Sequence, residues 1–185
     1  MIIAKKIKDK NCVHIGAKVL IRPPEIKDCD DLIELSLKSV RFHRGLANPP
    51  KQKQKFMEYF DKCSQPDFEG ALICRVDDNR IMGAINLSQI FRAGFQNAYM
   101  GYYIGESFAR KGYMTEALQL MLRHAFKCLK LHRIEANIQP KNIASVALVK
   151  RSSFTLEGYS RRYLKIGGKW QDHERWAILS EDWQA

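Results

Sequence analysis

A polar segment between a predicted strand and the longest predicted helix has the residue types of an anion-binding turn. It runs from Gly105 to Glu116 and contains Arg110, Lys111 and Gly112. The first turn of a helix exposes unpaired N–H groups at the positive end of the helix dipole, and glycine lets an anion approach the backbone. We expect a phosphate-binding turn here, with an ordinary helix start as the alternative. The segment contains neither GxxxxGK(S/T) nor GxGxxG, which argues against a P-loop and a dinucleotide fold.

Two further motifs lie downstream of this turn. Residues 140–145 read PKNIAS and are predicted to open a helix, and residues 153–159 read SFTLEGY and open a strand. The side-chain oxygen of Asn142 can accept a hydrogen bond from an N–H group of the first helical turn, so we predict that Asn142 caps this helix. We interpret Glu157 as a structural residue rather than a catalytic one.

Together with the strand at 99–104 and the turn at 110–113, these motifs make the chain resemble the GNAT acetyltransferase superfamily. The nearest likeness is its RimJ/RimL branch, which acetylates the N-terminal amino groups of ribosomal proteins. The resemblance extends over about residues 18–183. It implies a GNAT-like fold and acetyl-CoA as cosubstrate.

In that family, a turn of pattern Q/R-x-x-G-x-G/A wraps the pyrophosphate of acetyl-CoA with backbone N–H groups. Gly112 matches the central glycine, whereas Ala109 and Met114 depart from the pattern. Because the backbone does most of the binding, the resemblance still implies a CoA site. The family also places oxyanion donors on the strand at 102–104. The cofactor contacts implied in this chain are Tyr102, Tyr103, Ile104, Ala109, Arg110, Lys111, Gly112, Tyr113, Met114, Thr115 and Asn142.

Acetyl transfer to an amine requires a proton donor for the departing CoA sulfur and an acceptor for the amine proton. Many relatives carry a tyrosine donor seven residues after the asparagine, but this chain has Val149 there. RimL-like members instead have a serine three residues after the asparagine, which matches Ser145. A serine that bonds only within the first helical turn is the alternative. For the base, Glu106 and His173 are the leading candidates, beside a chain of waters.

Histidine and cysteine spacing does not predict a metal centre. The histidines do not form HExxH, and the five cysteines include no CxxC pair. We therefore expect no metal and no disulfide framework. An odd number of cysteines also fits a reducing compartment.

The elements that must position these residues follow from hydrophobic periodicity. Predicted strands lie near 19–21, 71–76, 81–87, 98–104, 134–138, 154–166 and 169–178, and predicted helices near 28–40, 56–63, 114–129 and 142–150. The last two strands meet at Gly167 and Gly168, which favours a tight primed turn. The order predicts a single α/β (α+β) domain, with a central mixed, mostly antiparallel sheet of about seven strands flanked by about four helices.

Length and composition are those of a single packed domain. The chain has 185 residues, of which 45% are apolar, and we divide it into an N-terminal extension at 1–17 and a domain at 18–185. It shows no signal-peptide pattern and no apolar run long enough for a membrane span, so we expect a cytoplasmic protein without a membrane partner. The sequence fixes no oligomeric state, and a monomer and a homodimer stay open.

The chain has 31 Lys and Arg residues against 20 Asp and Glu residues, a net charge of +11. Part of this surplus suits an anionic cosubstrate, and the rest suits a docking surface, for example on the ribosome, or a solvated face. We expect an N-acetyltransferase that acts on a protein N-terminus. The alternatives are a small-amine acetyltransferase for a polyamine or aminoglycoside, and a non-catalytic basic module that binds ribosome or RNA. Cationic acceptors call for an acidic pocket, which makes the small-amine alternative less attractive.

Overall fold

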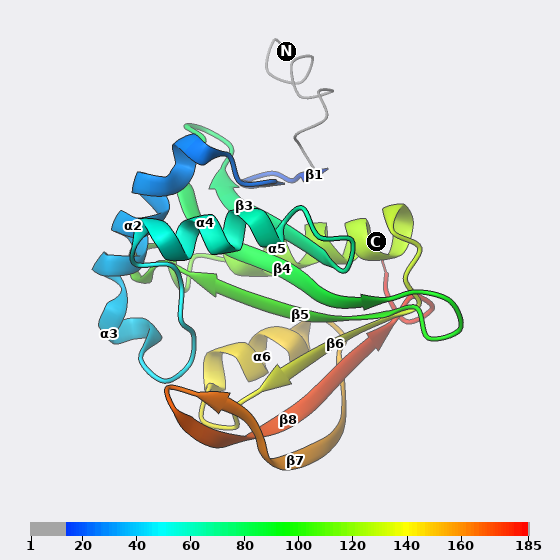
Figure 1. Ribbon diagram of the computed structural model, residues 1–185. Helices are drawn as coiled ribbons and strands as arrows, with labels where there is room; N and C mark the ends of the chain where they lie inside the picture. The colour runs from blue at the N-terminus through cyan, green and yellow to red at the C-terminus, as the bar shows by residue number, and fades with distance from the viewer. Residues whose placement is uncertain (1–13, 185) are drawn as a thin grey trace.

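The computed structural model describes residues 14–184, which form one open sheet with helices on both faces (Figure 1). The eight strands follow the order β1-β2-β3-β4-β5-β6-β8-β7, and all neighbours are antiparallel except β5 and β6. The prediction of a mixed, mostly antiparallel sheet is confirmed. The strands are β1 (His14–Ile15), β2 (Val19–Arg22), β3 (Phe68–Arg75), β4 (Ile81–Phe91), β5 (Asn97–Ile104), β6 (Arg133–Ile138), β7 (Thr155–Ile166) and β8 (Lys169–Leu179).

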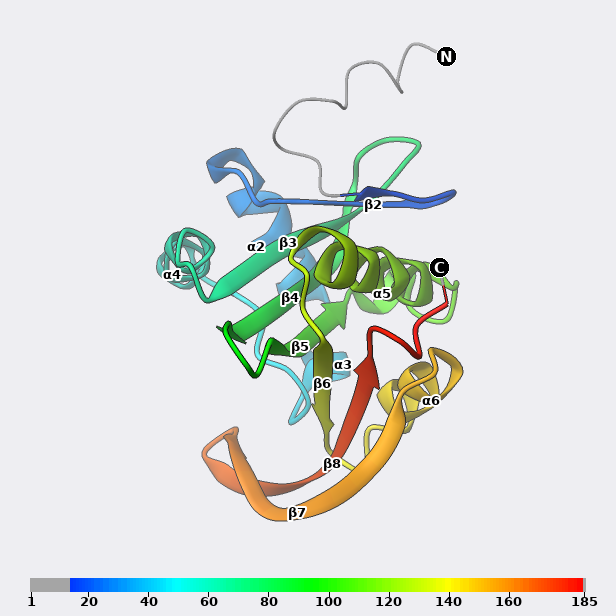
Figure 2. The same cartoon turned by 90° about the vertical axis from the view of Figure 1, so that its right-hand side faces the viewer.

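Helices cover both faces of the sheet (Figure 2). Helices α2 (Cys29–Lys38) and α4 (Lys53–Lys62) lie on one face, and α5 (Tyr113–Arg123) and α6 (Ile143–Arg151) lie on the other. The apolar stripe predicted for α5 is buried, with Leu118 and Met121 nearly inaccessible. Burial of each such side chain contributes roughly 1.5–3 kcal/mol. These contacts hold α5 against the sheet and fix where its first turn lies.

The structure adds four short elements to the prediction, among them two 3-10 turns at Ile26–Asp28 and Glu106–Phe108. Strand β1 has only two residues, too few to show alternation, and pairs with β2; the one-turn helix α3 (Val40–His43) follows α2 directly. The predicted helix at 114–129 is α-helical only to Arg123 and continues as a π-helical turn, His124–Cys128. Of the predicted N-terminal extension, residues 1–13 lie outside the described residues, and residues 14–17 belong to the β1–β2 hairpin.

Local predictions about turns and caps agree with the structure. Gly167 and Gly168 have φ of +60° and +80°, the backbone that a type I′ turn requires at both central residues. Glu157 pairs with Arg133, which supports its structural interpretation. Among the described residues, no helix combines the length and apolar character needed to cross a membrane.

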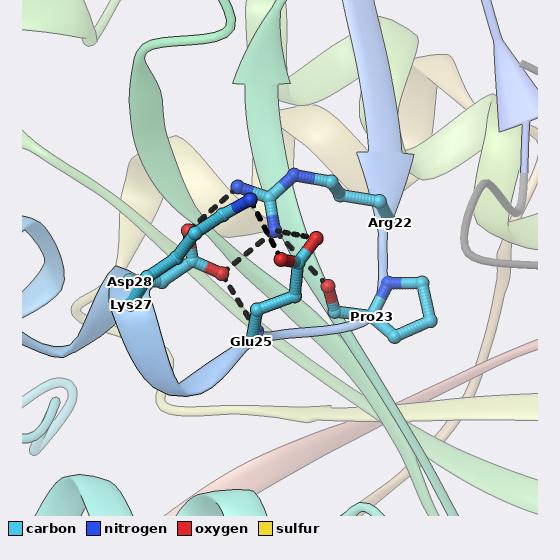
Figure 3. Close-up of polar contacts among 5 residues, drawn as sticks. All are labelled: Arg22, Pro23, Glu25, Lys27 and Asp28. Atoms are coloured by element: carbon cyan, nitrogen blue, oxygen red, sulfur yellow. Dashed lines mark hydrogen bonds and ion pairs between the residues drawn. The ribbon is translucent and has the colours of Figure 1, made fainter. Parts of the chain in front are cut away.

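A buried ion pair ties the end of β2 to the start of α2 (Figure 3). The two guanidinium nitrogens of Arg22 each donate to one carboxylate oxygen of Asp28 at 2.7 Å. Asp28 also accepts from the backbone N–H of Glu25 at 2.7 Å. Asp28 lies at the N-cap position of α2, where a carboxylate also favours the start of a helix. Its side chain neutralises a buried arginine, and loss of one partner of such a pair typically costs about 3–5 kcal/mol.

Candidate active site

Strands β5 and β6 begin side by side and then separate (Figure 1). Their parallel pairing covers only three residues on each strand, from Asn97 opposite Arg133 to Tyr99 opposite Glu135. Beyond that point, β5 continues against β4 and β6 continues against β8. One edge of β5 therefore faces an open wedge in the middle of the sheet.

The wedge opens into a cavity with a volume of about 1040 Å³. Its walls come from both diverging strands, from α4 and the segment before it, from the start of α6, and from the β7–β8 hairpin. The lining includes Met100, Gly101, Tyr102, Tyr103, Ala136, Asn137, Ile138, Asn142, Ser145, Leu164, Ile166 and His173. The fold thus brings Tyr102, Asn142, Ser145 and His173, which are distant in the sequence, into one cavity.

Backbone donors of β5 point into this wedge. The N–H of Gly105 donates to Met82 of β4, and hydrogen-bonding groups alternate between the two edges of a strand. The N–H groups of Tyr102 and Ile104 therefore lie on the edge that faces β6. Donors fixed on a rigid strand are suited to stabilising a developing oxyanion.

The first turn of α6 holds Ser145 at the cavity wall. The side-chain oxygen of Asn142 accepts the backbone N–H of Ser145 at 3.2 Å, so the predicted cap is confirmed. Burial raises the pKa of Tyr102 to about 12, and interaction with the Ser145 side chain opposes that rise. Ser145 and Tyr102 both line the cavity.

His173 reaches the same cavity from β8. The side chain is buried, and its Nδ1 lies 3.0 Å from the backbone oxygen of Gln171. A carbonyl oxygen can only accept, so Nδ1 carries the proton and Nε2 keeps its lone pair. Burial lowers the pKa of His173, which keeps the ring neutral near pH 7. These features are those of a general base.

Glu106 is not brought together with these residues. It lies in a second hollow, formed by α2 and the β3–β4 turn, and does not line the cavity that holds Ser145 and His173. Its backbone N–H donates to the hydroxyl of Ser39 at 3.0 Å. Glu106 follows β5 after one residue, Gly105, and the chain turns away from the wedge at that glycine.

The turn at 109–114 presents backbone rather than side chains. Arg110 has φ of +61° and Gly112 has φ of +84°, and a Cβ at position 112 would meet no atom within 4 Å. The first helical bond of α5 runs from the N–H of Glu116 to Gly112, and no side chain caps the helix. The N–H groups of Tyr113, Met114 and Thr115 therefore have no partner within the helix. Lys111 folds back, with its ammonium group 2.8 Å from the oxygen of Ser107. Unpaired N–H groups at such a helix start can bind an anion.

Sequence reasoning missed residues that hold β5 and the wall beneath α4 in place. The Nε2 of His43 lies 2.8 Å from the backbone oxygen of Ile104 and holds the end of β5 in place. The hydroxyl of Tyr59 donates to Asn86 at 2.9 Å, beneath α4. No motif marks these residues, because their partners lie far away in the sequence.

The charged residues of the cavity are mostly basic. Lys51, Lys55 and Lys62 line it, and Glu58 is the single carboxylate among the described lining residues. Both carboxylate oxygens of Glu58 accept from Lys55, at 2.7 and 3.0 Å. The cavity therefore carries a net positive charge at neutral pH.

Known proteins match this chain over most of its length. A family model described as an acetyltransferase (GNAT) domain matches residues 18–155. The Bacillus subtilis protein named "Probable N-acetyltransferase YjcK" is 32% identical over 175 residues, which cover 90% of this chain and 97% of that protein. The Escherichia coli ribosomal protein uS5-alanine N-acetyltransferase is 40% identical over 107 residues, 58% of this chain and 55% of that protein. The chain belongs to the GNAT acetyltransferase family and is an N-acetyltransferase.

Solved structures share the fold. The ribosomal-protein-S5-alanine acetyltransferase from Vibrio fischeri superposes with a TM-score of 0.81 at 20% identity, over 93% of this chain and 98% of that one. RimJ from Mycobacterium smegmatis, in complex with CoA-disulfide, superposes with a TM-score of 0.82 at 24% identity, over 88% of this chain and 82% of that one. A chimera of the spermidine N-acetyltransferase from Vibrio cholerae superposes with a TM-score of 0.76 at 20% identity, over 89% of this chain and 97% of that one. The fold is the one that uses acetyl-CoA, and these neighbours differ in their acceptors.

Proposed function

We propose that this protein transfers the acetyl group of acetyl-CoA to the α-amino group of a protein N-terminus. The observation that carries this proposal is the basic wall of the acceptor cavity. Lys51, Lys55 and Lys62 would repel a polyamine or an aminoglycoside, whose charges are all positive. A peptide brings one amine and can bring carboxylates behind it. The uS5-alanine enzyme of Escherichia coli supports the same acceptor class.

The open cavity also suits a chain better than a small molecule. Its wall continues from the wedge at Tyr102 past α4 to the segment before it, so a peptide could lie along α4 with its amine in the wedge. Acidic residues downstream of the amine would then meet the lysines. We infer a preference for N-termini followed by Asp or Glu.

The proposal assigns a group of this chain to each step of acetyl transfer. In the proposed mechanism, the amine nitrogen attacks the thioester carbon, and the N–H of Tyr102 stabilises the charge that develops on the carbonyl oxygen. The C–N bond forms and the C–S bond breaks. Nε2 of His173 accepts the proton of the amine, and the hydroxyl of Ser145 gives its proton to the CoA sulfur. Water restores the proton of Ser145 and removes the proton of His173.

The turn at 109–114 holds the cosubstrate in this proposal. Backbone N–H groups of Tyr113, Met114 and Thr115 bind the pyrophosphate, and Gly112 leaves room for it. Ala109 and Met114 depart from the family pattern only in their side chains. Glu106 has no part in this mechanism, because it lines a different hollow.

A CoA-release assay with matched acceptors tests the proposal. The panel contains an alanine-starting peptide with acidic residues at positions 2–4, the same peptide with lysines there, its N-acetylated form, and spermidine. We expect kcat/KM to be highest for the acidic peptide, lower by at least about tenfold for the basic one, and undetectable for the blocked one. A higher kcat/KM for spermidine than for every peptide would overturn the acceptor class.

Reversal of the charge of a single lysine tests, in the same assay, whether the cavity wall selects the acceptor. Lys51→Glu changes a cavity lysine, whereas Lys53→Glu changes an exposed lysine of α4 that does not line the cavity. We expect Lys51→Glu to lower the ratio of kcat/KM for the acidic peptide to kcat/KM for the basic peptide. We expect Lys53→Glu to leave this ratio unchanged. An equal effect of both variants would show that overall charge, not the cavity wall, selects the acceptor.

A further inference from the structure

Two histidines and a cysteine come together at the far end of α5, away from the acceptor cavity. A single ligand atom from each of His14, His124 and Cys128 lies within 4.8 Å of the other two. Nε2 of His14 is 3.7 Å from Sγ of Cys128, and the two imidazole rings pack edge to face with centroids 5.6 Å apart. None of the three residues lines the cavity of Ser145.

The fold builds this cluster from two separate elements. His14 lies on β1, and the N–H of Lys18 in the β1–β2 hairpin donates to the carboxylate of Glu116 on α5 at 2.9 Å. His124 and Cys128 are the first and last residues of the π-helical turn. Residues four apart lie on the same face of a helical turn, so the side chains of His124 and Cys128 are neighbours. Such turns occur frequently at functional sites.

The cluster presents ligand atoms in the forms that bind metal. Nε2 of His124 is buried without a hydrogen-bond partner among the described residues. The carboxylate of Glu69 lies 3.6 Å from that nitrogen, too far for a hydrogen bond. Cys128 is a free, exposed thiol.

We propose that His14, His124 and Cys128 form a binding site for a zinc ion, with Glu69 or water in the fourth position. Tetrahedral zinc with its usual bond lengths sets nitrogen and sulfur ligands about 3.6 Å apart, and the His14 nitrogen and Cys128 sulfur are 3.7 Å apart. A mixture of imidazole and thiolate ligands favours zinc over magnesium or calcium. The thiolate of Cys128 balances one of the two charges of the ion, and the carboxylate of Glu69 lies 3.6 Å from Nε2 of His124.

The site would join the start of the sheet to the end of α5. Zinc bound to β1 and the π-turn fixes the β1–β2 hairpin against the helix whose first turn lies beside the wedge. Its role is structural, because its ligands do not contact the acceptor cavity. We had expected no metal from sequence spacing, since His14 and His124 are 110 positions apart and form no recognised motif.

Metal titration of the full chain tests this site without any measurement of acetyl transfer. The protein is stripped with a chelator and reduced, then titrated with Co²⁺ and with Zn²⁺. We expect one Co²⁺ per chain with a thiolate-to-metal charge-transfer band, which one equivalent of Zn²⁺ displaces. The band should be lost in Cys128→Ser. His14→Gln and His124→Gln should each weaken Zn²⁺ binding by at least about tenfold, and Zn²⁺ should raise the Tm of the wild type.

Matched controls separate this site from other thiols and histidines. Cys63→Ser and His132→Gln change residues outside the cluster and should leave Co²⁺ binding unchanged. Far-ultraviolet circular dichroism checks that each variant is folded. The proposal is overturned if wild type shows no charge-transfer band. It is also overturned if the folded His14→Gln, His124→Gln, Cys128→Ser triple variant binds Co²⁺ as the wild type does, or if Cys12→Ser alone abolishes the band.

Discussion

Helices α5 and α6 lie on the same face of the sheet, but their N-termini are capped differently. The N-terminus of α6 is closed by its own side chain, since Asn142 accepts the N–H of Ser145. The N-terminus of α5 has no side-chain cap and begins after Gly112 in a left-handed conformation. An uncapped terminus keeps its N–H groups for a ligand, whereas a capped one holds its side chains still. We infer that α5 binds the phosphates and α6 positions a proton donor.

The largest effect is expected from the capped helix. Ser145→Ala should lower kcat by about 100-fold, because the CoA sulfur would leave without a proton donor. The Kd of acetyl-CoA, measured by calorimetry, should stay unchanged. Ser152→Ala removes a buried hydroxyl at the other end of α6 and should leave kcat unaltered. Unchanged turnover in Ser145→Ala would remove Ser145 as the donor.

His173 lies on β8 and lines the same cavity as Ser145 of α6. The variant His173→Gln tests whether this histidine is the general base. Because the pKa of His173 is lowered from 6.5, activity should be lost as pH falls through that lowered pKa and retained above it. His173→Gln should lower kcat by at least about tenfold and abolish this inflection. The inflection of the acceptor amine, near pH 7.7, should persist in the variant. An acid limb identical to wild type would contradict the role of His173 as base.

Substitution of Gly112, the residue before α5, tests whether the N-terminus of this helix binds the phosphates. Gly112→Ala places a side chain at φ of +84°, which strains the turn and displaces its N–H groups. We expect the Kd of acetyl-CoA to rise about tenfold, which corresponds to about 1.4 kcal/mol. Gly168→Ala is the matched control, because that glycine has φ of +80° with equally open space but lies in the β7–β8 turn. Equal Kd values for the two variants would contradict phosphate binding by α5.

The smallest effect is expected from the cap itself. Asn142→Ala removes the acceptor for the N–H of Ser145 and should lower the free energy of unfolding by about 1 kcal/mol. The turnover should fall only a few-fold, since Ser145 remains. Asn142→Asp keeps a capping oxygen and should recover the stability, as measured by urea unfolding. If Asn142→Asp were as unstable as Asn142→Ala, the cap would not explain the difference between the two helices.

Local features could be predicted from the sequence, and features set by packing could not. The cap at Asn142 and the primed turn at Gly167 depend on a few neighbouring residues, so residue type was sufficient to predict them. The choice between Glu106 and His173 depends on which edge of the sheet the chain follows after β5. The sequence shows no sign that the chain leaves the wedge at Gly105.

The same distinction applies to the fold and to the acceptor cavity. Seven of the eight strands were predicted from apolar runs or alternating residues, whereas β1 has only two residues and was not predicted. The lysines of the cavity come from α4 and from the segment that precedes it. Only the packing of α4 on the sheet brings them to face β5. Charge composition alone indicated a basic surface but not its position beside the acceptor.

The position of the acetyl group on a peptide that contains both an α-amino group and a lysine side chain identifies the acceptor amine. The enzyme is incubated with acetyl-CoA and an alanine-starting peptide that has acidic residues at positions 2–4 and one internal lysine. Tandem mass spectrometry then locates the acetyl group. We predict acetylation of the α-amino group and none of the lysine, with one CoA released per acetyl transferred. Acetylation confined to the lysine side chain, or no acetyl transfer to this peptide, would contradict the account.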